Sequence, residues 1–423
     1  MMLKEIQVPL FDLIMCLSDV ADFINPLVTN HQKQVAYIAL RIAEELGLSL
    51  EERTQIVLAG ELHDIGFLSL KDRMAFLDFE FETEGIFNHE KIGYSLIRKF
   101  KPLSDAATLI RFHHVKWNGG AGIESQGIQV PIGSHILHLA DRIAVLINKE
   151  QEVLGQVKTI TERVLEQSDK MFKPELVEAF KNLSIMEYFW LDAASPTVGT
   201  IIHHKMRPSE IELDIKGLIE LARLFAYIID FRSPFTANHS SGVTATAEVL
   251  AKLADFSERE CEMMKAAGYL HDLGKLAVPR EILEKPDSLN KDEFNVMQSH
   301  VYYTYRVLER IDDLDAINTW AAFHHERLDG KGYPFHLKAD ELPLGSRIMA
   351  VADVFTAITE DRSYRKGMSA ENALHVLQQM ANSALDPQMV SLLIHNFDEI
   401  NAVRQTAQEL ATAEYRSFQL QSA

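Results

Sequence analysis

The sequence predicts an all-α protein made of two tandem helical domains of related design. Apolar residues recur at helical spacing along most of the chain, for example through Gln34–Leu46, Val243–Leu253 and Ala373–Met380. The alternation that is typical of strands is confined to two short segments, Thr197–His203 and Gln129–Ile132. A third observation, an internal repeat of histidine and aspartate residues, divides the chain into two halves.

The repeat consists of seven residues that occur in the same order in each half. The first series is His31, His63, Asp64, His89, His113, His114 and Asp141. The second series is His239, His271, Asp272, His300, His324, His325 and Asp353. The first interval is 32 residues in both series, and the later intervals differ by at most three. We therefore predict two homologous domains, at residues 1–207 and 208–423, because Pro208 interrupts a charged segment there.

The composition excludes several classes of protein. A net charge of -19 disfavours binding to DNA, RNA or an anionic membrane, because the protein's own field repels phosphate. Only two cysteines, Cys16 and Cys261, are present, which favours the cytoplasm over an oxidising compartment. The segment Ile215–Phe231 is apolar but too charged to span a membrane, so we expect a buried or interfacial helix. Its central part, Leu218–Ile229, could pair in a homodimer.

The residue types of the two series suit transition metal ions. Ten of the 17 histidines belong to them, and histidine with carboxylate favours iron, manganese, cobalt, nickel or zinc over magnesium and calcium. In the second half we expect one shell of His239, His271 and Asp353, another of His300, His324 and His325, and Asp272 as the bridge. Two ions held in this way can activate water and bind a phosphoryl group. A closed structural site is the alternative, although such sites favour cysteine.

Three further features of the second half point to a phosphate ligand. Lys275 follows His271 by four residues, so on a helix it would share that face and could reach a bound phosphate. A loop rich in turn-forming residues follows the paired histidines and reads Gly330-Lys331-Gly332-Tyr333-Pro334. A cationic cluster suited to phosphate and guanine edges consists of Arg362, Arg365 and Lys366. The ordinary alternatives are a solvated lysine, a simple turn and a solvated charged run.

These motifs resemble the HD superfamily of phosphohydrolases, and specifically its HD-GYP branch, over about Phe231–Met380. The matching segments are His271–Lys275, His324–Pro334, Ala350–Phe355 and Asp361–Arg365. The resemblance implies two tandem HD-type helical domains and hydrolysis of cyclic di-GMP or of the mixed cyclic GMP–AMP. It implies that the second series holds two divalent transition ions, with iron or manganese expected. It also implies catalytic roles for Asp272 and for Lys275, which would meet the scissile phosphate or protonate the leaving group.

One departure from the family concerns a third metal ion. In some relatives a glutamate stands four residues before the first histidine and helps to hold that ion. This sequence has Phe235 at that position. We therefore expect two ions, and the linear 5′-phosphorylated dinucleotide as the product of a single cleavage.

The first half has its metal set but lacks the substrate motifs of the second. Phe67 stands where the second half has Lys275, and Gly119–Gly122 stands near the place of the tyrosine-containing loop. Three interpretations remain open: a degenerate partner that shapes a dimer or gates the other half, a second phosphohydrolase such as a 5′-nucleotidase for the linear product, and a ligand sensor. For the whole chain, the alternatives are a phosphohydrolase for another nucleotide and a non-catalytic signalling module.

Overall fold

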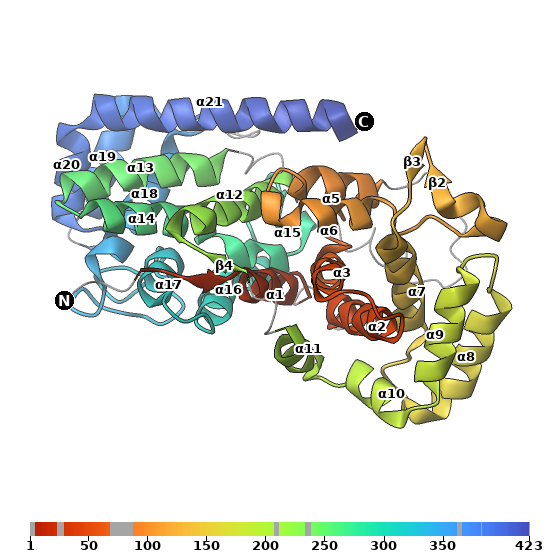
Figure 1. The fold of residues 1–423 in the computed structure, drawn as a ribbon. Helices are drawn as coiled ribbons and strands as arrows, with labels where there is room; N and C mark the ends of the chain where they lie inside the picture. The colour runs from red at the N-terminus through yellow and green to blue at the C-terminus, as the bar shows by residue number, and fades with distance from the viewer. Residues whose placement is uncertain are drawn as a thin grey trace. The chain divides into compact units, whose positions relative to one another are not determined.

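The structure is a computed structural model that describes residues 5–22, 29–67, 88–206, 211–232, 238–361, 366–381 and 383–422. It is mostly helical, as the sequence predicts, and the strands among the described residues are only two residues long. The chain divides into two compact units, Leu10–Ile211 and Glu212–Gln421, and the residues up to Pro9 join the latter (Figure 1).

The first unit, Leu10–Ile211, is a helical bundle with one short hairpin. Its helices are α1 (Leu10–Asp22), α2 (His31–Glu45), α3 (Leu50–Leu62), α5 (His89–Ile97), α6 (Ser104–Arg111), α7 (Ile132–Leu146), α8 (Val157–Glu166), α9 (Pro174–Ser184), α10 (Glu187–Ala193) and α11 (Val198–Met206). The 3-10 turns are η1 (Lys101–Leu103), η2 (Asn118–Ile123) and η3 (Leu154–Gln156). The hairpin pairs β2 (Glu124–Ser125) with β3 (Ile128–Gln129). Within this unit α2 packs against both α3 and α7.

The second unit is also a helical bundle and contains a single strand pair. Its helices are α12 (Ile215–Arg232), α13 (His239–Leu253), α14 (Glu258–Leu270), α15 (Arg280–Leu283), α16 (Lys291–Leu308), α17 (Asp315–Ala322), α18 (Leu344–Thr359), α19 (Ala370–Met380), α20 (Pro387–His395) and α21 (Phe397–Ser422), with the 3-10 turn η5 (Leu273–Ala277). The strand β1 (Val8–Pro9) pairs antiparallel with β4 (Glu212–Leu213). Here α13 packs against α14 and α18, which matches the arrangement of α2.

The repeat in the sequence is a repeat of elements. Helices α2 and α13 begin at the first histidine of each series, and α3 and α14 end one residue before the second. The latter two helices also share a capping box, formed by Ser49 with Glu52 and by Ser257 with Glu260. Matching start signals and spacing therefore place the same residue types at the same points of the two units.

A glycine in each unit lets the turn after the second histidine lie against a neighbouring helix. A Cβ atom on Gly66 would stand 2.0 Å from the carbonyl oxygen of His89, and one on Gly274 would stand 1.9 Å from that of His300. Neither position can hold a side chain, so only glycine permits this close approach. The approach places the turn after the second histidine against the backbone of the fourth member of each series.

Helix α12 is the apolar helix that the sequence predicts between the halves. Leu218, Leu221, Phe225 and Ile229 are all buried within the chain, where α12 packs against α14. These side chains pack within the chain, and a homodimer formed through this helix stays a prediction. No helix among the described residues is long and apolar enough to cross a membrane.

Both predicted strands differ from the structure. Of Gln129–Ile132, only Gln129 lies in a strand, β3, and Ile132 begins α7. Residues 198–203 of the predicted strand Thr197–His203 belong to helix α11. The buried side chains of that helix are Val198, Ile202 and Met206, at the helical spacing of four residues. The β-branched residues of this segment favoured a strand, but the burial of one helical face outweighs that local preference.

Candidate metal centres

The second unit brings all seven residues of its series into one buried cluster. Three overlapping groups have ligand atoms within 4.8 Å of one another: His239, His271 and Asp353; His271, Asp272 and His324; His300, His324 and His325. The first group joins α13, the end of α14 and α18, and the third joins α16 to the turn after α17. Residues separated by more than a hundred positions thus converge at one point of the bundle.

The backbone fixes the protonation of three of these histidines. The Nδ1 atoms of His271, His300 and His324 lie 2.7, 2.7 and 2.6 Å from the carbonyl oxygens of Gly268, Met297 and Ala321. A carbonyl oxygen can only accept, so each Nδ1 carries the proton and each Nε2 keeps a lone pair. Histidines that bind metals commonly have such a second contact, which orients the ring.

His324 carries the clearest indication that these residues fit a metal ion. Its Nε2 atom is buried and has no hydrogen-bond partner among the described residues. Leaving a buried polar atom unpaired costs on the order of 1–3 kcal/mol. Burial lowers the pKa of His324 well below its usual value and lowers that of His300 to about 3. Both rings are therefore neutral at pH 7, which is the form that binds metals.

Glu360 joins the cluster, although it is not among the site residues that the sequence predicts. Nδ1 of His239 lies 3.1 Å from Oε2 of Glu360, and its Nε2 lies 3.1 Å from Oδ1 of Asp353. Gln408 of α21 donates to the same Oε2 at 3.2 Å. Burial lowers the pKa of His239, but the two carboxylates outweigh burial and raise it to about 10. Glu360 follows Asp353 by two helical turns, and this spacing is the signal that could have identified it.

Lys275 reaches the cluster through Asp272. Its Nζ atom lies 2.5 Å from Oδ2 of Asp272. The expected geometry is wrong in one respect: α14 ends at Leu270, and Lys275 lies in the 3-10 turn η5. The lysine therefore faces the residue three positions back, rather than His271 four positions back. Burial raises the pKa of Asp272, but His271 and Lys275 hold it well below its usual range.

The tyrosine-containing loop lies beside the last histidine of the series. The ring centroids of Tyr333 and His325 are 5.0 Å apart, and the backbone N–H of Tyr333 donates to the carbonyl oxygen of His325 at 3.2 Å. Gly330 has a φ of 72°, which favours glycine at this turn. Lys331 is exposed and Pro334 is partly buried. The loop thus places one aromatic ring against the cluster and leaves its tip in solvent.

A buried glutamate holds this loop in place. The carboxylate of Glu326 accepts hydrogen bonds from the backbone N–H groups of Phe335 at 2.7 Å and Leu337 at 3.1 Å. A Cβ atom on Gly332 would stand 2.4 Å from the Cα atom of Glu326, so the loop can pack this closely only through glycine. The sequence analysis included Glu326 only as part of a motif. Its role in supporting the loop is evident only from the structure.

Three of the predicted residues lie outside the described residues, namely Phe235, Arg362 and Arg365. Lys366, the third member of the predicted cationic cluster, is exposed. No contact in the described part of the chain connects Lys366 to the histidines.

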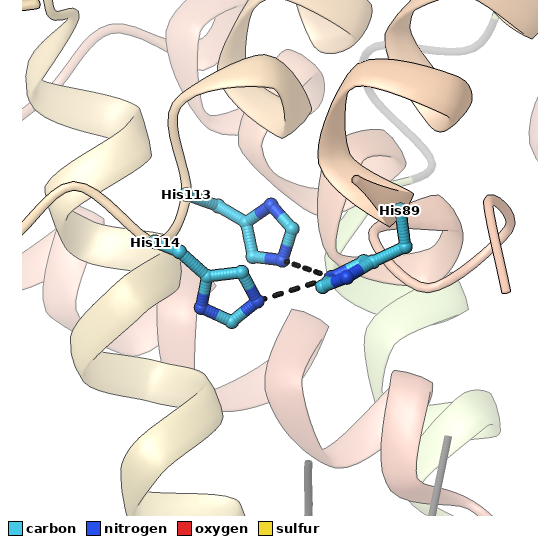
Figure 2. A group of neighbouring side chains, drawn as sticks. All are labelled: His89, His113 and His114. Carbon is cyan, nitrogen blue, oxygen red and sulfur yellow. Dashed lines mark hydrogen bonds between the residues drawn. The ribbon is translucent and has the colours of Figure 1, made fainter. Parts of the chain in front are cut away.

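The first unit forms a second buried cluster from its own series. His31, His63 and Asp141 make one group, and His89, His113 and His114 make another. Figure 2 shows the three rings of the latter turned toward one another, with Nε2 of His89 at 3.4 Å from His113 Nε2 and at 3.0 Å from His114 Nε2. Asp64 lies 3.2 Å from His63 Nε2 and 4.0 Å from His31 Nε2.

The histidines of the first unit are also in the metal-binding form. Nδ1 of His113 lies 2.6 Å from the carbonyl oxygen of Ile110, so its proton is on Nδ1 and its Nε2 has a lone pair. Burial, with a contribution from His63, lowers the pKa of His113 to about 4. Burial also lowers the pKa of His89 and His114 well below the usual value. Three neutral rings that converge through Nε2 fit a metal ion.

An aspartate in each unit extends the repeat by one residue. Asp22 and Asp230 stand nine positions before the first histidine of their series, and both are buried. Burial raises the pKa of Asp230 well above its usual value, and Ser240 donates to its Oδ1 at 3.4 Å. Equal spacing in the two halves is a sequence signal that could have identified this pair.

Comparison with known families identifies both units. A family model described as HD domain matches residues 28–146, and a second model, also described as HD domain, matches residues 223–389. The chain contains two HD domains. Each matched range contains all seven members of one histidine and aspartate series.

Named relatives of the two HD domains are cyclic dinucleotide phosphodiesterases. A Vibrio cholerae protein named 3′3′-cGAMP-specific phosphodiesterase 1 is 29% identical over 395 residues, which cover 90% of each chain. A second, 3′3′-cGAMP-specific phosphodiesterase 3 of that organism, is 29% identical over 66% of this chain and 60% of its own. A cyclic di-GMP phosphodiesterase response regulator of Xanthomonas campestris is 32% identical over 48% of this chain and 54% of its own. These relatives confirm the resemblance to HD-GYP phosphodiesterases.

The fold of the whole chain also has a solved counterpart. A crystal structure of a cyclic GMP-AMP specific phosphodiesterase from Vibrio cholerae matches with a TM-score of 0.64. The match covers 93% of this chain and 98% of that chain, at 22% sequence identity. Tandem HD domains are therefore a fold that this chain shares with a solved protein.

Proposed function

We propose that the second HD domain hydrolyses a cyclic dinucleotide, cyclic di-GMP or 3′3′-cyclic GMP–AMP, to the linear 5′-phosphorylated dinucleotide. The observation that carries this proposal is the contact of Lys275 with Asp272 at the histidine cluster, in a chain homologous to cyclic dinucleotide phosphodiesterases. The relative that covers 90% of each chain is named for the mixed ring, which favours 3′3′-cyclic GMP–AMP.

The second series is proposed as the ligand set for two divalent transition ions, iron or manganese. Neutral histidines with backbone-fixed rings support this role, as does the unpaired Nε2 of His324. Asp272, with His271 on one side and His300 on the other, is the proposed bridging carboxylate. When bound, such ions supply an activated water and neutralise charge on the phosphoryl oxygens.

Lys275 and the loop are proposed to act on the substrate. The ammonium of Lys275, held by Asp272, can donate to a phosphoryl oxygen or to the oxygen that leaves the phosphorus. Tyr333 lies beside His325 and offers an aromatic face to a base. The remaining proposed substrate contacts are Gly330, Lys331, Gly332, Pro334, Arg362, Arg365 and Lys366.

For the first HD domain we propose a separate phosphohydrolase activity that removes the 5′-phosphate of the linear product. Two groups of convergent ligands support a metal-dependent reaction in this domain, and Phe67 in place of a lysine argues against an identical one. The domains are proposed to divide at residues 1–207 and 208–423. They are proposed to act in the cytoplasm, where the buried thiols of Cys16 and Cys261 would stay reduced.

Two measurements test these assignments against the alternatives. A non-catalytic signalling module has no need of stoichiometric metal, so we expect about two bound transition ions per intact cluster. A protein that binds no metal and stays inactive after reconstitution would contradict the enzymatic proposal. Metal-bound protein that releases phosphate from mononucleotides but leaves every ring intact would instead favour a phosphohydrolase for another nucleotide.

The two domains are separated by matched variants. With linear 5′-phosphorylated dinucleotide supplied, Asp64→Ala should stop the release of phosphate, whereas Asp272→Ala should leave it unchanged. If neither variant affects that reaction, the first domain acts as a gating partner or a sensor.

A further inference from the structure

The two clusters differ in the place of their positive charge. In the second domain the cation is Lys275, which contacts Asp272 in the turn after the second histidine. In the first domain the matching position is Phe67, which carries no charge and stacks on His89 with ring centroids 4.0 Å apart. A phosphate approaching the first cluster therefore meets no cation from this turn.

A cation enters the first cluster from α7 instead. Nη2 of Arg142 lies 2.6 Å, and Nε lies 3.2 Å, from Oδ2 of Asp141. The other oxygen of Asp141, Oδ1, lies 3.1 Å from Nε2 of His31. In the second domain the residue after the series aspartate is Val354, so this cation is specific to the first domain.

Arg142 is buried together with Asp141. The side chains of Arg142 and Asp141 are each only 4% exposed, which is unusual for charged residues and requires that they be paired.

Both clusters bring carboxyl groups and a cation together. Among the described residues, the charged groups in contact with the first series or its members are Asp64, Glu90, Asp141 and Arg142. Those of the second are Asp272, Asp353, Glu360 and Lys275. In the described residues the cation of the second cluster lies in the turn η5, whereas that of the first lies on α7.

We propose that Arg142 is the phosphate-binding residue of the first HD domain, and that this domain takes nucleotides with a terminal phosphomonoester. A guanidinium presents parallel N–H donors that match two phosphate oxygens, and a monoester dianion supplies more charge for them than a diester. The glycine-rich segment Gly119–Gly122 lies in the kinked turn η2, and this segment contains no aromatic residue at the place of Tyr333. Hydrolysis would add water across the P–O5′ bond and release inorganic phosphate and a 5′-hydroxyl.

The inference rests on the proposed phosphohydrolase function of the first domain, and its test does not depend on ring opening. Full-length protein with Asp272→Ala, loaded with Mn(II), is titrated with inorganic phosphate by calorimetry, and bound metal is measured in each sample. Any phosphate binding by the second domain is then the same in all variants. We compare Arg142→Gln and Arg142→Lys with Arg98→Gln, a matched change at an exposed arginine that packs on Tyr94.

We expect Arg142→Gln to weaken phosphate binding about tenfold or more with metal content retained, because the positive charge and the paired N–H donors of the guanidinium are both lost. Arg142→Lys keeps the charge and should weaken binding by a smaller factor, and Arg98→Gln should have no effect. Unchanged phosphate affinity in metal-loaded Arg142→Gln or Arg142→Lys would overturn the proposal. So would loss of metal in parallel with loss of phosphate binding in both variants, because Arg142 would then support Asp141 alone.

Two nucleotides test the proposed substrate class. The protein that keeps Arg142 should be protected against thermal unfolding by linear 5′-phosphorylated dinucleotide and also by a 5′-mononucleotide. Arg142→Gln should remove this protection. Protection without release of phosphate would leave the role of Arg142 intact and contradict only the proposed hydrolysis. No protection by either nucleotide would contradict the substrate class.

Discussion

The ring of Phe67 lies flat on the ring of His89, with centroids 4.0 Å apart and planes 16° from parallel. The same position in the second domain holds Lys275, whose ammonium contacts Asp272. One substitution in the repeated turn therefore replaces a charged contact with an aromatic one. The aromatic contact packs against a ligand-type histidine, and the turn of the first domain has no counterpart of the Lys275 ammonium.

Phe67→Ala should destabilise the first domain. Phe67 is 8% exposed, so the change removes a buried ring and its stacking on His89, and should cost about 3–5 kcal/mol. Urea denaturation followed by circular dichroism measures this loss. Phe67→Leu is the control that keeps most of the apolar volume and should cost clearly less. Equal stability of Phe67→Ala and wild-type protein would contradict the packing described for this ring.

Metal binding by the second domain should release a proton from His239 at about pH 8. Glu360 and Asp353 outweigh burial and raise the pKa of His239 to about 10, whereas binding requires a lone pair on Nε2. Apparent metal affinity should therefore increase as the pH rises toward 10. In the metal-free protein the same raised pKa stabilises the fold fully below about pH 6.5, and this stabilisation is lost as the pH rises through 10.

The proton release is measured by titrating Mn(II) in buffers with different ionisation enthalpies. Glu360→Gln keeps an acceptor for His239 but removes a negative charge, so it should reduce both the proton release and its pH dependence. Identical proton release in Glu360→Gln and wild-type protein would show that Glu360 does not control His239.

Glu326→Ala should weaken substrate binding more than it slows turnover. The change leaves the N–H groups of Phe335 and Leu337 without their carboxylate acceptor, and each costs on the order of 1–3 kcal/mol if it stays buried. The loop that carries Tyr333 should then become less ordered, and the KM for the cyclic dinucleotide should rise. Glu326→Gln keeps one acceptor and should have a smaller effect. A fall in kcat with KM unchanged would argue against a role in the loop.

Lys275→Ala should lower turnover while metal stays bound. Loss of a cation at the phosphoryl oxygens costs a factor of about 100 to 1,000 in kcat, and Lys275 is not among the proposed ligands. Asp272→Ala should abolish cleavage through loss of the bridging carboxylate. Metal analysis of both proteins checks the distinction. A large loss of metal from Lys275→Ala would mean that the lysine supports the metal site instead.

The sequence predicted the all-α fold and the members of both clusters. The clusters could be predicted because the intervals between their members are nearly equal in the two halves. His63 and His271 both stand at helix ends and both direct Nδ1 to the carbonyl oxygen three residues back. Their equal distance from the first histidine was sufficient to pair them. The position of Lys275 was not predicted, because the spacing does not reveal that α14 ends and a tighter turn begins.

The contacts that support the clusters were beyond the sequence for a different reason. Gln408 meets Glu360 from a helix 48 residues later, and this distance has no periodicity to reveal it. Arg142 is adjacent to Asp141, but neighbours on a helix normally point about 100° apart, so their pairing required the side-chain conformation. The sequence thus predicts which residues can bind metals better than it predicts what holds them.

The most direct test of the central claim is product analysis with three cyclic dinucleotides. Protein loaded with Mn(II) or Fe(II) is incubated separately with cyclic di-GMP, 3′3′-cyclic GMP–AMP and cyclic di-AMP, with Asp272→Ala as the control. We expect wild-type protein to convert 3′3′-cyclic GMP–AMP or cyclic di-GMP to its linear 5′-phosphorylated dinucleotide, and Asp272→Ala to leave both intact. Survival of all three rings with metal bound to wild-type protein would contradict this expectation.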